Sequence, residues 1–211
     1  TGEPFGYNEK TGDMRISGTA ASLAGLEKGI TQNNDLLIEM ALKRILLIHS
    51  VILSAGGIPL IYMGDEIAQL NDYQWRNDPE KKDDSRWTHR QAHDWVAAEN
   101  RTDTSTIQGQ LYQGLQALIM QRKQTPALGS GMSTFFSTQN EHVLGYIRSK
   151  SVLILANFSE SEQKVSRATL SAYADLSTVF DLRTQQAITL ERDIMLAPYE
   201  FVWWQYSDHK E

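Results

Sequence analysis

The sequence predicts an α/β segment followed by an all-β domain, an antiparallel β-sandwich. Three observations support this fold class: a long and widely apolar helix, a short apolar run typical of a strand buried on both faces, and a change of composition after Pro126. Beyond that proline, short runs rich in Val, Ile, Phe, Tyr and Trp alternate with polar turn residues, which is typical of a sandwich. We place the boundary between the two parts near residues 124–131.

A long helix is predicted over about residues 35–54. Asn33-Asn34-Asp35 offers an N-cap before it, and Gly56-Gly57 ends it. Its polar side chains follow one narrow stripe, formed by Asp35, Glu39, Lys43, Ser50 and Ser54. Because apolar residues cover most of the remaining surface, we expect the helix to be buried on more than one side.

The next segment, Ile58-Pro59-Leu60-Ile61-Tyr62-Met63, is apolar and has no period-2 alternation, which predicts a parallel strand buried on both faces. Two acids, Asp65 and Glu66, follow it, at the end of a strand where parallel α/β folds place their sites. Adjacent strand residues point to opposite faces, so the two carboxylates cannot easily act on one bond. We expect them to be structural, with Asp65 the one that would face a pocket mouth.

A long polar stretch, residues 71–104, contains Asp83-Asp84-Ser85-Arg86-Trp87. Loops longer than ~15 residues are usually functional or carry small elements of their own. Helical spacing of apolar residues then predicts a second helix over about residues 105–122. Strands are expected at 132–137, 142–148, 152–158, 164–165, 178–181, 188–190 and 194–206. The aromatic side chains of Tyr199–Tyr206 either all pack in the interior or leave one face as a platform for sugar rings.

Charge and composition exclude several kinds of partner. The chain has 211 residues, a net charge of −6 and 20 Lys+Arg that are scattered along it, so neither nucleic acid nor an anionic membrane surface is expected as a partner. The absence of cysteine excludes disulfides and thiolate metal sites, and it is typical of a reducing compartment such as the cytoplasm. No metal ion or other cofactor is expected, because only His89 and His93 have a usable spacing and no third ligand is evident.

The first part of the chain lacks the neighbours that its own pattern requires. Residues 1–126 contain a single candidate parallel strand and a helix that is apolar nearly all round. Such a strand needs parallel partners, so we expect the chain to be the C-terminal part of a longer α/β protein. A dimer that supplies the missing surface is the alternative.

The segment from Gly56 to Glu66 resembles the eighth barrel strand of glycoside hydrolase family 13, the α-amylase family. Val152–Ser159 and Leu196–Glu200 resemble strands of the C-terminal domain of that family. Within the family, the stretches most similar to the sucrose-acting members, amylosucrase and sucrose hydrolase, are Pro4–Asn8, Thr11–Ala21, Leu70–Asp72 and Lys82–Arg90.

The resemblance implies the end of a (β/α)8 barrel that carries an extra domain. Residues 1–30 would be the tail of that extra domain after barrel strand seven. Residues 31–126 would form barrel helix seven, strand eight and helix eight, and residues 127–211 the β-sandwich. The apolar faces of the chain would be covered by the preceding part of the barrel or by a partner.

The resemblance also implies an activity for the full-length parent. Such an enzyme cleaves sucrose by the retaining two-carboxylate scheme, releases fructose and transfers glucose to an α-1,4-glucan. Its catalytic carboxylates would all precede Thr1, so this chain alone is expected to be inactive. The alternatives are a sucrose hydrolase or another family 13 α-glucosidase or isomerase, and, in a different class, a non-catalytic carbohydrate-binding β-domain.

Four residues are candidates for binding substrate by this resemblance. Arg86 would pair with an acid from an early barrel loop and close the far end of the glucose pocket, or else it is an exposed residue paired with Asp83 or Asp84. Arg15 would contact the fructosyl or acceptor sugar, and Asn8 would line the acceptor site, unless both are ordinary loop residues. Asp65 is the fourth candidate. Gly6 departs from the pattern, because amylosucrase carries Gln there, and this puts polymer synthesis in question.

Overall fold

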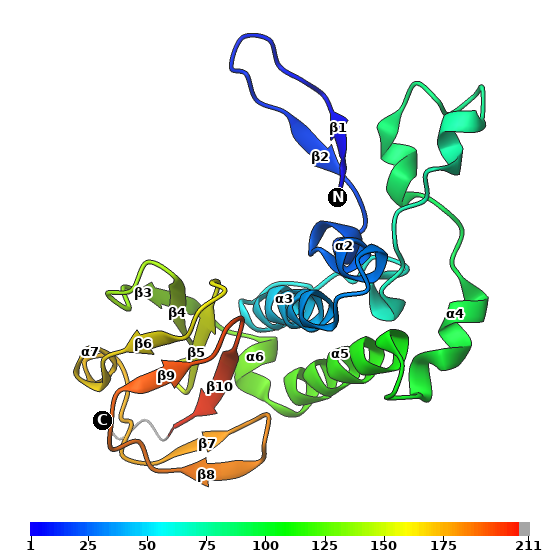
Figure 1. Cartoon of the computed structure of the whole chain (residues 1–211). Helices are drawn as coiled ribbons and strands as arrows, with labels where there is room; N and C mark the ends of the chain where they lie inside the picture. The colour runs from blue at the N-terminus through cyan, green and yellow to red at the C-terminus, as the bar shows by residue number, and fades with distance from the viewer. Residues whose placement is uncertain (207–211) are drawn as a thin grey trace. The chain divides into compact units, whose positions relative to one another are not determined.

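The computed structural model describes residues 1–206, and the chain divides into two compact units (Figure 1). The first unit comprises residues 1–45 and 61–113, and the second comprises residues 46–60 and the chain from residue 114 onward. Two long helices, α3 (Asp35–Ser54) and α5 (Ile107–Gln124), contribute residues to both units.

The helix α3 has the bounds that the sequence predicts. The side chain of Asn34 accepts a hydrogen bond from the backbone N–H of Leu37 (3.1 Å) and so satisfies one of the free donors at the start of the helix. Gly56 and Gly57 follow its end with positive φ angles of 106° and 75°, which glycine adopts at no steric cost. The helix α5 starts two residues later than predicted because Thr106 caps it: its Oγ1 accepts from the N–H of Gly109 (3.0 Å).

The first unit is built from short elements around the beginnings of the two long helices. A hairpin of β1 (Glu3–Phe5) and β2 (Arg15–Ser17) opens the chain and pairs Phe5 with Arg15. Its other elements are α1 (Ala20–Leu23), α2 (Leu26–Thr31), α4 (Trp95–Glu99) and the 3-10 helices η1 (Asp65–Ile67), η2 (Gln74–Asn77), η3 (Ser85–His89) and η4 (Asn100–Thr102). The long polar stretch therefore carries small elements of its own, as its length predicts.

The strand predicted over residues 58–63 is not present in the structure of this chain. Ile58 is 99% exposed and Leu60 is 79% exposed, where a strand buried on both faces was expected. A strand needs a neighbour for its hydrogen bonds, and no strand in residues 1–206 pairs with this segment. Asp65 and Glu66 accordingly lie in η1 and not at the end of a strand.

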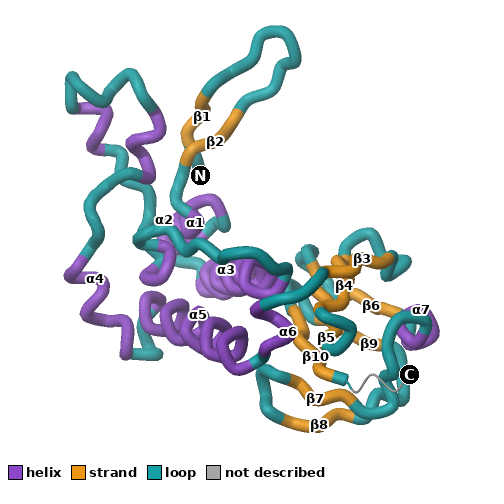
Figure 2. Tube along the Cα trace, turned by 180° about the vertical axis from the view of Figure 1, so that it is seen from behind, coloured by secondary structure: helices purple, strands orange, loops and turns teal. Residues whose placement is uncertain are grey.

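The second unit contains the predicted antiparallel sandwich (Figure 2). Its larger sheet has the strand order β3-β4-β5-β10-β7-β8, and its smaller sheet pairs β6 with β9. The strands are β3 (Ser133–Phe136), β4 (Val143–Arg148), β5 (Val152–Asn157), β6 (Gln163–Val165), β7 (Val179–Asp181), β8 (Gln186–Ile188), β9 (Ile194–Leu196) and β10 (Phe201–Gln205). Two short helices, α6 (Pro126–Gly129) and α7 (Arg167–Ser171), complete the unit.

The sandwich core lies between the two sheets and α7. Leu153 and Leu155 of β5, Val202 and Trp204 of β10 and Leu170 of α7 belong to one buried cluster. The predicted run 194–206 is divided into β9 and β10 by a turn. All five of its aromatic side chains, Tyr199, Phe201, Trp203, Trp204 and Tyr206, are at most 8% exposed. They therefore pack in the interior, which excludes the sugar platform considered for this strand.

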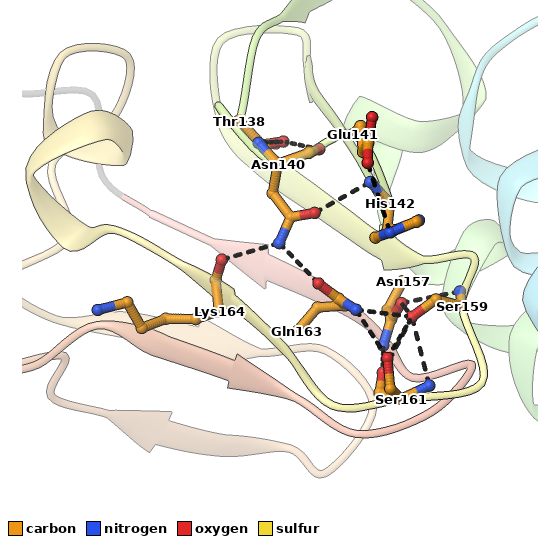
Figure 3. Close-up of polar contacts among 9 residues, drawn as sticks. All are labelled: Thr138, Asn140, Glu141, His142, Asn157, Ser159, Ser161, Gln163 and Lys164. Carbon is orange, nitrogen blue, oxygen red and sulfur yellow. Dashed lines mark hydrogen bonds and ion pairs between the residues drawn. The ribbon is translucent and has the colours of Figure 1, made fainter.

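A buried amide joins the loop after β5 to the turn before β10, and Figure 3 shows its bonds to Ser159 and Ser161 in that loop. Asn157 is fully buried, and its Nδ2 donates to the carbonyl oxygens of Ser161 (2.8 Å), Leu196 (3.2 Å) and Ala197 (2.8 Å). Its Oδ1 accepts from both the N–H (2.9 Å) and the hydroxyl (2.8 Å) of Ser159. One side chain thus satisfies backbone groups from two separate loops.

The other face of the larger sheet packs on helical residues of the same unit. The hydroxyls of Ser54 at the end of α3 and Tyr146 on β4 are hydrogen bonded at 2.5 Å. Arg148, also on β4, is 1% exposed and donates to the carbonyls of Gly131 (2.9 Å) and Ser130 (3.0 Å). The central strands β4, β5 and β10 are therefore buried on both faces over most of their length. No helix within the described part of the chain is long and apolar enough to cross a membrane.

Candidate functional site

Arg86 and Asp84 form a forked ion pair at the start of η3. Asp84 is the N-cap of this helix, and its Oδ1 accepts from the backbone N–H of Arg86 (3.0 Å). The same carboxylate accepts from the Arg86 side chain, Oδ1 from Nε (2.8 Å) and Oδ2 from Nη2 (2.8 Å). Pairing with Asp83 or Asp84 was one alternative that the sequence left for Arg86, and in the structure Arg86 pairs with Asp84. The side chain of Arg86 is 43% exposed.

The fork holds both groups in their charged forms. The hydrogen bonds from Arg86 lower the pKa of the Asp84 carboxyl to about 2, against an ordinary value of 3.8. The same bonds raise the pKa of the Arg86 guanidinium. An opposite charge at hydrogen-bond distance favours the ionised form of each partner. The pair is therefore fully ionised at neutral pH.

An aromatic ring lies against the guanidinium. The Cζ atom of Arg86 is 4.7 Å from the ring centroid of Phe5 on β1, a cation–π distance. Phe5 is also the cross-strand partner of Arg15 on β2. Directly opposed residues of an antiparallel pair share a face, so Arg15 lies on the same face of the hairpin as Phe5. Phe5 therefore contacts one predicted site residue, Arg86, and is the cross-strand partner of another, Arg15.

Two further contacts fix the hairpin on the loop that carries Arg86. The hydroxyl of Ser85 donates to the carbonyl of Pro4 (2.7 Å). The guanidinium of Arg76 pairs with the carboxylate of Glu3 at 2.5 Å. Both contacts join residues more than 70 positions apart, so the position of β1 relative to η3 is set by several bonds and not by Phe5 alone.

Asn8 lies in the turn at the far end of the hairpin. An ordinary loop position was the alternative that the sequence analysis gave to a role in the acceptor site. Its Oδ1 accepts from the backbone N–H of Lys10 (3.0 Å), and its carbonyl accepts from the N–H of Gly12 (2.9 Å). Gly6 precedes it with a φ of 63° and open space around the position of a side chain. No contact among residues 1–206 joins Asn8 to Arg15 or Arg86.

Asp65 and Glu66 are the first two residues of η1, a different element from the one that carries the fork. Glu66 has local contacts: its Oε2 accepts from the N–H of Gly64 (2.9 Å), and its Oε1 is 3.7 Å from Nδ1 of His93. The ring of His93 in turn meets Trp95 edge-on, with centroids 4.6 Å apart. These contacts are those of a structural residue, which is the role expected for Glu66.

His89 and His93 do not share a helical face. The helix η3 ends at His89, and the next helix, α4, begins only at Trp95. Burial lowers the pKa of His89. Within residues 1–206, no three His, Asp or Glu side chains are placed to hold one metal ion.

The sequence made Arg86 a candidate but gave no sign of Phe5, the residue whose ring contacts it. The contact joins positions 81 residues apart, so no local pattern announces it. Asp84 itself is a residue type that is preferred at helix N-caps, and it directly precedes η3. Two shallow hollows of about 410 Å³ each lie on the second unit, one beside Glu191 and Arg192 and one beside Asp175 and Phe180. Neither contains a predicted site residue.

No family model matches the chain, but solved structures do. AmyP in complex with maltotriose matches 79% of this chain and 35% of its own, with a TM-score of 0.59 and 20% identity. Ttha1563 from Thermus thermophilus matches 81% of this chain and 32% of its own, with a TM-score of 0.57 and 19% identity. A mutant of trehalulose synthase MutB in complex with Tris matches 78% of this chain and 38% of its own, with a TM-score of 0.54 and 17% identity.

These similarities establish the fold. The chain spans about a third of the length of each of these proteins, and it has the architecture of the corresponding part: helices followed by an antiparallel β-sandwich. At identities of 20% or less, the match does not carry an activity from those proteins to this one.

Proposed function

We propose that the chain is the C-terminal part of a family 13 glycoside hydrolase or transglucosidase, and specifically of a sucrose-acting glucosyltransferase similar to amylosucrase. The observation that carries the proposal is the stretch Lys82–Arg90, which is similar to amylosucrase and in which Arg86 contacts the ring of Phe5, the cross-strand partner of Arg15. The similarity in fold to AmyP and to trehalulose synthase supports the coarser assignment to family 13.

In this proposal the chain supplies binding groups and the preceding part of the barrel supplies the chemistry. Retaining glycosidases need a carboxylate nucleophile and a carboxylic acid that protonates the leaving oxygen, and we assign neither to this chain. The guanidinium of Arg86 would donate hydrogen bonds to hydroxyls of the glucosyl unit, as a planar fork with fixed donors is suited to do. Arg15 would contact the leaving fructosyl group or the acceptor. The partners are therefore sucrose, an α-glucan and the preceding barrel.

A sucrose hydrolase is the second candidate, and Gly6 favours it. Gly6 stands where amylosucrase carries Gln, so the side-chain amide that could hydrogen bond to an acceptor sugar is missing here. A site that makes fewer bonds to a sugar acceptor discriminates less strongly against water. The glucosyl unit would then pass to water more often than to a glucan.

The test is product analysis of the longer protein that contains this chain. The protein is incubated with sucrose, and fructose, glucose and glucan are quantified by chromatography. Fructose in excess of glucose, together with glucan, supports the glucosyltransferase. Equal amounts of fructose and glucose support the hydrolase. Intact sucrose would refute both, and glucan binding by this chain alone would then favour a carbohydrate-binding domain.

A further inference from the structure

The loop that leads from α3 into the segment 58–63 is fastened by one arginine of α5. Nη1 of Arg122 donates to the carbonyl oxygen of Leu53 in the last turn of α3 and to that of Leu128 in α6 (2.8 Å). Its Nη2 donates to the carbonyl of Gly57 (2.9 Å), the residue directly before the segment. No acidic side chain within residues 1–206 pairs with this guanidinium, so its acceptors there are carbonyl groups. Carbonyls at helix C-termini carry partial negative charge, which suits a cation.

The loop has little conformational constraint of its own and depends on such contacts. Gly56 and Gly57 have positive φ angles, and glycine loses more conformational freedom on ordering than any other residue. The hydroxyl of Ser133 on β3 donates to the carbonyl of Ala55. The guanidinium of Arg148 lies against Gly56, so closely that a Cβ atom there would be 3.0 Å from Nη1. Three successive loop residues are therefore held by side chains of the second unit.

The segment 58–63 then presents large apolar side chains and unpaired backbone groups. Ile58, Leu60 and Tyr62 are 99%, 79% and 48% exposed, and the side chains between them are half-buried. This alternation with a period of two is that of an extended strand. Pro59 fixes its own φ and disfavours a helical conformation at the residue before it. Among residues 1–206, no hydrogen bond is made by the backbone of the first four residues of the segment.

We propose that Arg122 is a positioning residue for an interaction surface: it holds the segment 58–63 ready to pair with an apolar β-strand from the preceding part of the longer protein. A strand is the partner that satisfies unpaired backbone groups and covers apolar side chains at the same time. The chain spans only 35% of AmyP and 38% of trehalulose synthase MutB, so a protein of that length has other strands to offer. A segment whose entry is already fixed loses less conformational entropy on pairing.

This inference rests on the part of the proposed function that places the chain within a longer protein, and it deepens that part by naming the contact. Arg122→Gln removes the charged donors, and Arg122→Lys keeps one cationic donor group. Ser133→Ala removes the second anchor of the loop independently and is the milder change. Lys123→Gln is the matched control, because Lys123 is the exposed neighbour on α5 and makes no hydrogen bond or ion pair within residues 1–206.

The experiment follows hydrogen exchange at the amides of the segment 58–63 and of β5 (Val152–Asn157) in the longer protein, with the chain alone as the unpaired reference. In the wild-type longer protein we expect the segment to exchange about a hundredfold more slowly than in the chain alone, because paired strand amides are protected. Arg122→Gln should speed exchange in the segment about ten- to a hundredfold, since charge-assisted hydrogen bonds are lost, and leave β5 unchanged. Arg122→Lys should restore part of the protection, Ser133→Ala should have a smaller effect, and Lys123→Gln none.

The outcomes that overturn the inference are distinct from those that test the activity. Equal exchange of the segment in the longer protein and in the chain alone shows that no strand pairs with it. Protection that grows with the concentration of the chain alone assigns the surface to a second copy and contradicts the proposal. An unchanged segment in Arg122→Gln, or an equal rise in β5, refutes the positioning role. A longer protein that leaves sucrose intact refutes the proposed activity, whereas the exchange pattern still decides this inference.

Discussion

At the scale of single residues, the chemistry of the candidate site depends on one carboxylate. Oδ1 of Asp84 caps η3, and both oxygens of this carboxylate accept from the Arg86 side chain, so the charge state of Asp84 decides whether the guanidinium is held. Its folded pKa is about 2 and lies below the ordinary value of 3.8. A carboxyl with a depressed folded pKa stabilises the fold above its unfolded pKa, and this contribution is lost as the pH falls through the folded pKa.

We therefore predict that the fork persists from neutral pH down to about pH 4 and opens only as the pH approaches about 2. The measurement is a carbon-13 NMR titration of the Asp84 carboxyl. In the variant Arg86→Gln the midpoint should rise towards 3.8, because the largest cause of the shift is removed. The same midpoint in the wild type and in Arg86→Gln would show that the fork does not form.

At the scale of elements, the β-sandwich depends on bonds between loops as well as on its core. Asn157 ends β5, is fully buried and donates to the carbonyls of Ser161, Leu196 and Ala197. Removing a buried side chain of this kind leaves several backbone groups without partners, and each unsatisfied group costs roughly 1–3 kcal/mol.

We predict that Asn157→Ala lowers the free energy of unfolding of the second unit by about 2–4 kcal/mol, measured by urea unfolding followed by tryptophan fluorescence. Asn140→Ala is the control in the same cluster, because Asn140 donates to Gln163 (2.9 Å) and Lys164 (3.1 Å) at a partly exposed position. Its cost should stay below about 1 kcal/mol, since water can replace its bonds. If the two variants lower the free energy of unfolding equally, then the burial of Asn157 does not make its hydrogen bonds more important for stability than those of Asn140.

The elements that could be predicted from the sequence are those whose causes are local. The bounds of α3 follow from a cap, an apolar pattern and two glycines, and the strands of the sandwich follow from short apolar runs between turns. The strand predicted at 58–63 is absent because a strand of this kind forms only beside neighbouring strands, which residues 1–206 do not supply. In the candidate site, Arg86 was a candidate from its motif, whereas its contact with Phe5 depends on how the hairpin packs and has no local signal.

At the scale of the whole molecule, the segment 58–63 shows what the chain lacks. Ile58 and Leu60 are 99% and 79% exposed in a run that otherwise has the composition of a buried strand. Large apolar side chains that are adjacent and exposed indicate an interaction surface or a tendency to aggregate. In our proposal the preceding part of the barrel covers this segment. Ile58 and Leu60 would then promote association of the chain alone, but stabilise the fold of the longer protein.

We therefore predict that the double variant Ile58→Ser, Leu60→Ser increases the monomeric fraction of the chain alone, measured by size-exclusion chromatography with light scattering. In the longer protein the same variant should lower Tm by several degrees, because replacing a buried large apolar residue by a small one costs roughly 2–5 kcal/mol. Met132→Ser is the control, since Met132 is 80% exposed but lies outside the segment. If the longer protein tolerates the double variant as well as Met132→Ser, then the segment is exposed there too and does not form the eighth strand of a barrel.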